Sequence, residues 1–462
     1  MKISKTKHLR LIKILPIIFL GLILRLISLN QSFWLDEAIT AKVANFSFPE
    51  ILTFLKGDFN PPLYYLIIKF WADIFGNSEI SLRIPSVIFS LLSVFLLFLL
   101  AVDLSKNKAK IAALFLATSP LHIYYSQEAR AYSLACFLSL LTLFLFQKSL
   151  KNSKFWPLFS VSLVAMAFSH YQTILLLPVF PLFLGINKDK KNLRKTLTAF
   201  LPLFIAFIFY WPILRSQLSL GGGIEEGWTN VIGKLNGKNI GLISIKMIIG
   251  RISIENKIIY ALLSIVLVAV FWGLATLGYS LLYSLALFLP IILGIIISFR
   301  LSVLSYFRFT FLLPFFYLLI AAGIKKLSSK LSSKRIAIIL LTFILAVNLI
   351  CSLTYLLNPR FHRENWRLAV NYLEKNSPQP PVFILSQIDT AFHYYNQGKL
   401  KTISLDDFDQ YNQINLISYG LSIFDPEDKI RTRLGDLGFK AVWGDSFNFV
   451  GVERWEKKKL ER

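Results

Sequence analysis

Two adjacent carboxylates near the N-terminus are the first candidates for chemistry. Asp36 and Glu37 lie in the segment FWLDEAITAKVAN (33–45), directly after an aromatic pair. Successive side chains in a helix point about 100° apart, so one carboxylate can face a cavity while the other forms an ion pair or a cap. A carboxylate at a membrane boundary can act as a general base toward a hydroxyl nucleophile. The alternative is that both residues stabilise a helix start through the helix dipole.

A second pair of charges, Glu128 and Arg130, lies in HIYYSQEARAYSL (122–134), between two apolar runs. Charged side chains this close to the hydrocarbon are costly unless they face a cavity or one another. The planar guanidinium of Arg130 donates two hydrogen bonds at once and suits a phosphate group. The pair therefore indicates substrate binding or, alternatively, an ion pair that ties two helices together.

Four further residues are candidates for donor-phosphate or substrate binding. His170 and Tyr171 lie at the turn in FSHYQTILLLP (168–178), Arg308 lies in SYFRFTFLLPFF (305–316), and Arg83 begins an apolar run. A lone histidine is more often structural, and arginines at the ends of membrane spans often extend toward the interface. Arg83 also follows Glu79 by four residues, the spacing of an ion pair along one helix face.

The elements that must position these residues are membrane helices. Of the 462 residues 55% are hydrophobic and only 16% are charged, which is unlike a soluble protein. Spanning the hydrocarbon takes about 20 helical residues, and eleven apolar runs approach that length. They cover residues 14–29, 82–102, 111–124, 131–147, 155–169, 172–187, 196–215, 257–273, 279–298, 309–324 and 336–356.

Lysine-rich connections predict the orientation of these spans. Residues 103–110, 147–154, 187–195 and 325–335 are rich in lysine, and such loops face the cytoplasm. The N-terminus is then cytoplasmic, and the first external loop (31–81), the turns with the candidate site residues and the C-terminal tail lie outside. The net charge of +24 fits loops facing anionic lipid, and we therefore exclude a nucleic-acid partner. We expect the first run to be an uncleaved span; the alternative is a signal peptide.

The tail from residue 358 is the one segment that resembles a soluble module. Residues 362–376 have the apolar spacing of an amphipathic helix, and residues 381–386 and 439–444 are typical of strands. The sequence therefore predicts a transmembrane domain (1–357) with amphipathic helices in its first external loop, followed by a small extracytoplasmic α/β domain (358–462). A supporting role for this domain is favoured over acceptor binding.

Several other classes of site are excluded by motif. Cys136 and Cys351 both lie in apolar runs, and neither zinc-ligand spacing nor a Walker loop, dinucleotide fingerprint or nucleophile elbow occurs. The glycine run at Gly221–Gly223 opens a loop rather than a phosphate cradle. Because no soluble nucleotide site is evident, any sugar donor should be carried by a lipid and reach the site from the bilayer.

These segments together resemble a known family. WLDEA (34–38), NPPLYYLIIKFWADIFGNSEISLRIPSV (60–87), YYSQEARAYSL (124–134) and SHY (169–171) carry the likeness, with fainter echoes in YFRFTFLLPFF (306–316) and HRENWRLAVNYL (362–373). The chain resembles the GT-C glycosyltransferases, specifically the bacterial group related to the dolichyl-phosphate-mannose protein mannosyltransferases and to the aminoarabinose transferases of lipid A. About a third of the chain carries the resemblance.

The resemblance implies an inverting transfer of a sugar from a polyprenyl-phosphate donor to an acceptor hydroxyl at the outer face of the cell membrane. It implies that Asp36 is the base, that Glu37 supports it and that Arg130 faces the donor phosphate. Glu128 would lie at the cavity mouth, with His170 and Arg308 as further contacts. Family acceptors include protein, lipid and cell-wall glycan. We predict neither a cofactor nor a catalytic metal.

Two other classes of function stay open. A transporter or flippase of lipid-linked sugars would move its substrate without forming a glycosidic bond, and its charges would lie near the middle of the membrane. A non-catalytic subunit of a surface-polymer assembly complex would tolerate loss of both Asp36 and Arg130.

Overall fold

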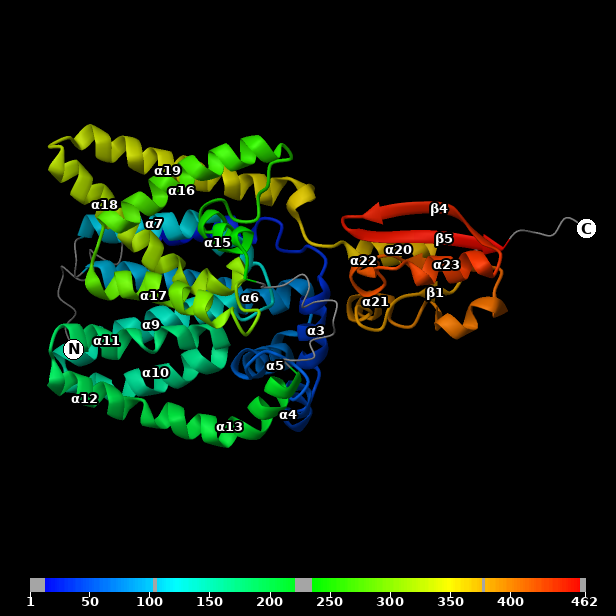
Figure 1. Cartoon of the computed structure of the whole chain (residues 1–462), viewed down its shortest axis with the longest axis horizontal. Coiled ribbons are helices and arrows are strands. Elements are labelled where there is room, and N and C mark those ends of the chain that lie inside the picture. Colours follow the sequence, from blue (N-terminus) through cyan, green and yellow to red (C-terminus); the bar gives the residue numbers. More distant parts are fainter. Residues whose placement is uncertain (1–12, 103–105, 221–234, 376–378, 458–462) are drawn as a thin grey trace, which may run out of the picture.

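A bundle of helices followed by a small sheet domain makes up the protein (Figure 1). The computed structural model describes residues 13–102, 106–220, 235–375 and 379–457; Gly221–Gly223 lie outside them. The bundle contains α2 (Leu15–Leu26), α6 (Glu79–Val102), α7 (Lys106–Thr118), α8 (Pro120–Ser126), α9 (Tyr132–Lys151), α10 (Trp156–Ser169), α11 (Val179–Ile186), α12 (Lys190–Ala199), α13 (Leu201–Leu220), α15 (Gly237–Ile249), α16 (Lys257–Leu277), α17 (Leu281–Ile297), α18 (Leu313–Lys330) and α19 (Lys334–Leu357).

Among the described residues, six helical segments are long and apolar enough to cross a membrane. They are Glu79–Val102, Tyr132–Lys151, Lys190–Ser219, Lys257–Leu277, Tyr306–Lys330 and Lys334–Leu357. Shorter apolar helices cover Leu15–Leu26, Tyr171–Ile186 and Leu281–Ile297. The predicted polytopic helical membrane fold is confirmed, while eleven spans, the division at residue 358 and the orientation stay predictions.

Close packing of α16 on α18 shows how the bundle is held together. A side-chain carbon on Gly278 would lie 1.9 Å from the Leu319 carbonyl oxygen, and one on Gly323 would lie 1.9 Å from that of Leu274. Only glycine permits this approach, as at small-residue contacts between membrane helices. By contrast, α13 and α16 keep large apolar side chains such as Phe209 and Ile258 exposed, as suits helices that face lipid.

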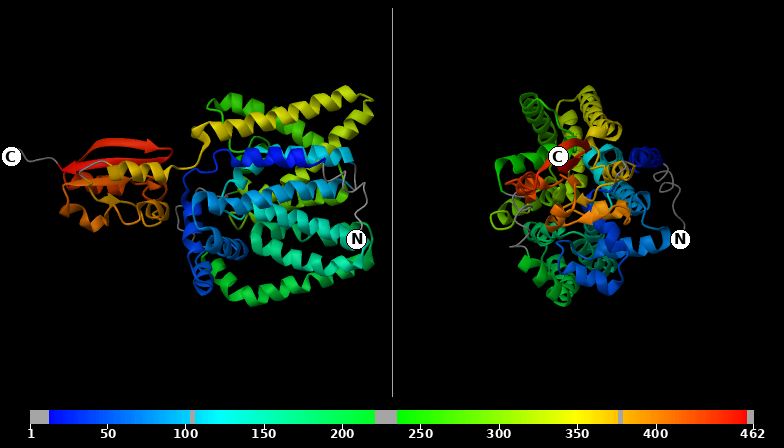
Figure 2. Two further views of the ribbon diagram at one scale, coloured as in Figure 1. Left: turned by 180° about the vertical axis from the view of Figure 1, so that it is seen from behind. Right: turned by 90° about the vertical axis from the view of Figure 1, so that its right-hand side faces the viewer.

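Three short helices from the predicted first external loop cross one end of the bundle. They are α3 (Leu35–Ala44), α4 (Phe48–Leu55) and α5 (Leu63–Phe75), and they lie on the side next to the sheet domain (Figures 1 and 2). A capping box of Ser47 and Glu50 begins α4, and Pro61 and Pro62 precede α5. The turns between α11 and α12 and between α18 and α19 lie at the opposite end of the bundle (Figure 1), and both are lysine-rich.

The C-terminal domain is built around a five-stranded sheet in the order β2-β1-β3-β5-β4. Its elements are α20 (Trp366–Lys375), β1 (Val382–Phe383), α21 (Thr390–Asn396), β2 (Thr402–Ile403), β3 (Gln413–Ile417), α22 (Leu421–Phe424), α23 (Lys429–Asp436), β4 (Phe439–Phe447) and β5 (Val450–Lys457). Strand β1 pairs in parallel with β2 and β3, and β5 runs antiparallel to β3 and β4. The predicted helix and two predicted strands correspond to α20, β1 and β4.

Candidate functional site

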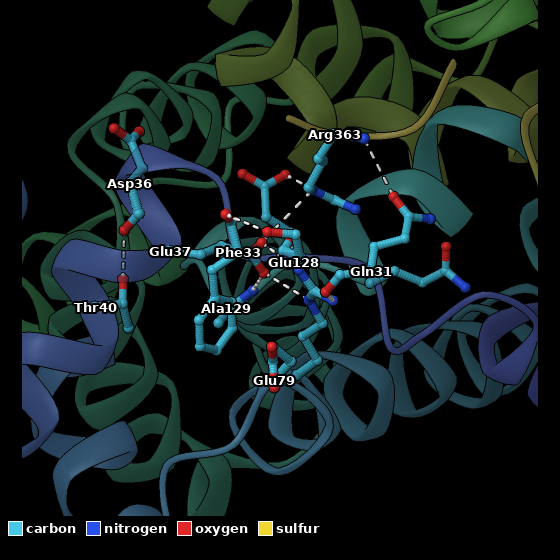
Figure 3. A network of polar contacts seen from close by, with 12 residues as sticks. Gln31, Phe33, Asp36, Glu37, Thr40, Glu79, Glu128, Ala129 and Arg363 are labelled. Atoms are coloured by element: carbon cyan, nitrogen blue, oxygen red, sulfur yellow. Dashed lines mark hydrogen bonds and ion pairs between the residues drawn. The ribbon is translucent and has the colours of Figure 1, made fainter. Parts of the chain in front are cut away.

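The first turn of α3 separates the two adjacent carboxylates. Trp34 precedes the helix in extended conformation, so Asp36 and Glu37 both fall in the first turn, where negative charge is favourable. Figure 3 shows the Asp36 side chain pointing away from the network that Glu37 joins. Asp36 Oδ2 lies 3.3 Å from Arg130 Nη2, and the two side chains are 32% and 12% exposed. The structure therefore brings together the two residues that the sequence predicts as base and phosphate ligand.

The surroundings of Asp36 favour its protonated form. Burial raises the pKa of Asp36 above its ordinary value, and Asp58 and Glu37 add to this effect, whereas Arg130 opposes it. Asp58 itself accepts a hydrogen bond from the Tyr65 hydroxyl at 2.9 Å. A carboxylate with a raised pKa and an accessible oxygen is suited to accept a proton.

Glu37 has a different environment, because it is fully buried among donors. Its Oε1 accepts hydrogen bonds from Arg83 Nε and from the Ala129 backbone N–H, both at 2.8 Å. Its Oε2 accepts one from Arg83 Nη2 at 2.5 Å. Burial raises the pKa of Glu37, but Arg83, Arg363 and the Ala129 N–H together outweigh burial, so the pKa lies below its ordinary value. Both oxygens are occupied, which is the environment of a positioning residue.

The local ion pair expected between Glu79 and Arg83 does not form. Arg83 is turned to Glu37, and its remaining donors bind the carbonyls of residues 29, 31 and 32. Glu79 instead accepts from Arg367 at 2.6 Å and from the Tyr395 hydroxyl at 2.8 Å. The fully buried carboxylate of Glu37 stabilises the Arg83 guanidinium more than the partly exposed Glu79, four residues away, would.

Glu128 lies in the turn between α8 and α9, two residues before Arg130. Its Oε2 is 3.4 Å from Nη2 of Arg363, a residue of the C-terminal part (Figure 3). Burial raises the pKa of Glu128 to about 7, although Arg363 opposes the shift. Arg363 Nε also lies 3.8 Å from Glu37 Oε2. The predicted alternative of a Glu128–Arg130 pair is absent, since each residue has another partner among the described residues.

His170 lies close to Tyr132, two residues after Arg130 in sequence. Its ring centroid is 5.6 Å from that of Tyr132, and its Nδ1 accepts from the Gln172 N–H at 3.2 Å. Burial lowers the pKa of His170 to about 3, and Arg308 and Arg130 contribute to this shift. His170 is therefore neutral near pH 7, and the charges of two guanidinium groups act on it.

Arg308 and Tyr171 differ in how directly they reach this region. Arg308 Nη1 donates to the Ser302 carbonyl at 2.8 Å, and the charge of Arg308 lowers the pKa of His170. Tyr171 points elsewhere: its hydroxyl donates to Gln217 Oε1 at 2.5 Å and lies 3.4 Å from the Tyr210 hydroxyl. The hydrogen bonds of Tyr171 therefore lead to Tyr210 and Gln217 on α13 rather than to Asp36.

Two arginines at the site are not predicted from the sequence. Arg363 lies in the segment HREN, whose only sequence signal is a faint family echo. Arg251 follows Gly250, whose φ of +64° and 3.0 Å distance from an added side-chain carbon to Pro120 require glycine. This turn places the exposed Arg251 guanidinium 4.9 Å from the Tyr124 ring centroid. Neither residue carries a spacing pattern that would have identified it.

The arrangement thus consists of an accessible carboxylate, a cationic surface and a buried ionic support. The cations are Arg130, Arg308 and Arg251, and the support is the Arg83–Glu37–Arg363–Glu128 network. Within the described residues, no three His, Cys, Asp or Glu side chains gather in a way that would hold a metal ion. Such a site can accept a proton from a hydroxyl and neutralise a leaving anion.

Comparison with known proteins gives matches in sequence to part of the chain. Residues 60–215 match the family described as dolichyl-phosphate-mannose-protein mannosyltransferase. A Bacillus subtilis (strain 168) protein named "Putative mannosyltransferase YkcB" is 27% identical over 164 residues. That alignment covers 34% of this chain and 23% of the relative, so the chain matches less than a quarter of the relative's length.

Solved structures match the fold over nearly the whole chain. ArnT from Cupriavidus metallidurans bound to undecaprenyl phosphate has a TM-score of 0.59 at 10% identity and covers 98% of both chains. Archaeal oligosaccharyltransferase AglB from Archaeoglobus fulgidus, in complex with an inhibitory peptide and a dolichol-phosphate, has a TM-score of 0.52 at 10% identity. It covers 100% of this chain and 75% of that one. These matches show that the chain has the fold of both solved structures and that residues 60–215 are similar to the mannosyltransferase family; its apolar helices make it a multi-pass membrane protein.

Proposed function

We propose that the protein is a membrane glycosyltransferase that moves a sugar from a polyprenyl-phosphate donor to an acceptor hydroxyl. The single observation that carries this proposal is the Asp36–Arg130 pair, an accessible carboxylate 3.3 Å from a guanidinium. A transfer of this kind needs a base for the hydroxyl and a cation for the departing phosphate. The family match over residues 60–215 and the fold shared with ArnT support the same class of reaction.

The reaction is a single displacement with inversion. Asp36 accepts the proton of the acceptor hydroxyl, and the hydroxyl oxygen forms a bond to the anomeric carbon. The bond from that carbon to the phosphate oxygen breaks, its electron pair stays on the phosphate, and the proton remains on Asp36. A raised pKa makes Asp36 a stronger base than an ordinary aspartate, although less of it is ionised at low pH.

Three guanidinium groups are available for the phosphate. Arg130 is next to Asp36, the charge of Arg308 acts on His170, and the exposed Arg251 lies over the Tyr124 ring. Neutral His170 adds no charge but can donate one hydrogen bond. Glu37 and Arg83 serve as positioning residues in this proposal because they satisfy each other's charge, and Glu128 does so because it is buried beside Arg363.

An apolar pocket between α4, α10 and α13 supports a lipid-linked donor. It has a volume of about 410 Å³ and is lined by Leu52, Val164, Phe168, Ala206, Phe209, Tyr210 and Ile213. Tyr210 connects it to Tyr171, whose hydroxyl binds Gln217, and Gln217 donates to the Asn60 carbonyl beside Asp58 at 3.3 Å. We assign this pocket to the prenyl chain of the donor.

The site would work at the extracytoplasmic face of the cell membrane. It lies at the end of the bundle opposite the lysine-rich turns between α11 and α12 and between α18 and α19 (Figure 1), and such turns face the cytoplasm. This orientation gives a cytoplasmic N-terminus and an extracytoplasmic C-terminal domain. The acceptor is a lipid, a glycan or a protein of the envelope.

The test compares cells that lack the protein with cells that carry the wild type or Asp36→Asn. The lipid-linked glycans that accumulate without the protein identify the donor. Radiolabelled donor in isolated membranes then reports new glycosidic bonds. We expect the wild type to transfer sugar and Asp36→Asn to lose at least a hundredfold in rate at equal abundance. Movement of the lipid across the membrane without a new glycosidic bond would favour a flippase instead.

A further inference from the structure

The link between α19 and α20 brings one guanidinium from the C-terminal part into the bundle. The Arg363 side chain is 1% exposed. Its Nη2 donates to the Tyr124 carbonyl at 3.1 Å, its Nη1 donates to the Tyr355 hydroxyl at 3.3 Å, and its carbon Cζ lies 4.4 Å from the Tyr124 ring centroid. The guanidinium is therefore fixed from several sides by residues of the bundle.

The backbone of Arg363 is held by the sheet domain. Asn448 Nδ2 donates to the Arg363 carbonyl at 2.6 Å and to the His362 carbonyl at 3.2 Å. Asn448 and Phe449 form the two-residue turn between β4 and β5, with φ of 48° and 75°. This left-handed region suits Asn and is rare for Phe. The turn holds the Asn448 amide against the backbone of residues 362 and 363, so the position of the sheet domain determines where the Arg363 backbone lies.

The charge of Arg363 is shared between two carboxylates. Its Nη2 is 3.4 Å from Glu128 and its Nε is 3.8 Å from Glu37. Glu37 also has Arg83 as a close partner, whereas the ion pair recorded for Glu128 within the described residues is with Arg363. In the same part of the chain, Arg363 Nε and Glu128 Oε1 are buried without a hydrogen-bond partner. Loss of Arg363 would therefore remove the ion-pair partner of Glu128 and leave its carboxyl group buried and poorly hydrogen-bonded.

We propose that Arg363 is a positioning residue through which docking of the C-terminal domain sets the geometry of Asp36 and Arg130. Glu37 is the neighbour of Asp36 on α3, and the Arg130 N–H donates to the Glu128 carbonyl at 2.8 Å. The Arg363 guanidinium thus contacts both segments of the site: Glu37 beside the proposed base, and Glu128 near the proposed phosphate ligand. The sheet domain is in this sense part of the active site. The kinetic consequence, though not the geometry, rests on the proposed function.

Hydrogen exchange tests the geometry independently of activity. The full-length protein in lipid nanodiscs is compared as wild type, Arg363→Gln, Arg363→Lys and the matched control Arg360→Gln. Arg360 is on the same link, pairs with Glu255 at 2.6 Å and is 56% exposed. We expect at least tenfold faster exchange in residues 35–44 and 127–131 for Arg363→Gln. The expected change in exchange rate is under twofold for Arg360→Gln and intermediate for Arg363→Lys. The lysine variant keeps the positive charge, so it still tests the inference if Arg363→Gln does not fold.

A second-site change separates an electrostatic role from a packing role. In Arg363→Gln/Glu128→Gln the unpaired carboxylate is gone, so we expect slower exchange in residues 127–131 than in Arg363→Gln alone. Sugar transfer from the endogenous lipid-linked pool of membranes should fall at least tenfold in Arg363→Gln, and binding of undecaprenyl phosphate should change less than threefold.

Two results would overturn the inference: wild-type exchange in Arg363→Gln, or an equal effect of Arg360→Gln. No recovery in the double variant would overturn the electrostatic role and assign the positioning by Arg363 to packing. Absence of transfer by the wild type would instead remove the proposed function, and the exchange data would still decide the role of Arg363.

Discussion

Replacement of Glu37 by glutamine should destabilise the protein through a buried, uncompensated Arg83. Glu37 is fully buried and receives two hydrogen bonds from Arg83, at 2.8 and 2.5 Å, and one from Ala129. The substitution keeps the shape of the side chain and removes its charge. Breaking a buried ion pair from one side costs about 3–5 kcal/mol, so we expect a loss of about 4 kcal/mol in unfolding free energy. Denaturant unfolding of the purified protein in detergent measures this loss.

The matched control is Glu79→Gln, which removes one partner of a partly exposed ion pair at the same end of the bundle. Glu79 and Arg367 lie 2.6 Å apart with side chains 17% and 39% exposed, and pairs of this kind contribute about 0–1 kcal/mol. Equal destabilisation by the two substitutions would refute the assignment of Glu37 to the buried support.

The pH dependence of the Glu37→Gln effect follows from the pKa of Glu37. Burial raises that pKa, Arg83, Arg363 and the Ala129 N–H together lower it more, and the resulting pKa lies below the ordinary 4.5. The unfolded chain therefore binds this proton more tightly, and the stability that the charge contributes is present above pH 4.5 and is lost as the pH falls below it. The gap between wild type and Glu37→Gln should narrow in acid. A gap that stays constant below pH 4.5 would contradict the reasoning.

Two other substitutions test the buried support and the donor pocket. Because the pKa of Glu128 is raised from 4.5 to about 7, the native state holds that proton more tightly, and stability should fall by roughly 3 kcal/mol as the pH rises through this window. Glu128→Gln should abolish that slope between pH 4.5 and 7 in unfolding experiments; an unchanged slope would assign it to other groups. Ala206→Trp fills the apolar pocket and should weaken undecaprenyl phosphate binding at least tenfold, whereas Ile338→Trp on the exposed face of α19 should not. Equal affinities would place the prenyl chain elsewhere.

The membrane fold could be predicted because hydrocarbon imposes one strong rule. Each predicted apolar run overlaps a helix of the described chain, since a backbone in lipid must satisfy its own hydrogen bonds. The sheet was harder to predict. Strands β1 and β2 have two residues each, too few to show the alternation by which a strand is recognised.

The Asp36–Arg130 pair followed from the predicted topology, which placed both residues on one side of the membrane. Arg363 could not be found in this way, because Glu128 is 235 residues away in sequence and no local spacing links them. The expected Glu79–Arg83 pair failed for a related reason. A rule for residues four apart on one helix takes no account of a buried carboxylate on another helix.

The central claim is that Asp36 accepts the acceptor proton, and it is tested by measuring donor binding and transfer on the same purified protein. Membrane extracts from cells lacking the protein supply the accumulated lipid-linked sugar as donor, and undecaprenyl phosphate reports binding. Asp36→Asn removes the base but keeps the shape of the side chain. We predict undecaprenyl phosphate affinity within threefold of wild type, with transfer in a single turnover slowed at least a hundredfold. Transfer at the wild-type rate by a folded Asp36→Asn protein would contradict the account.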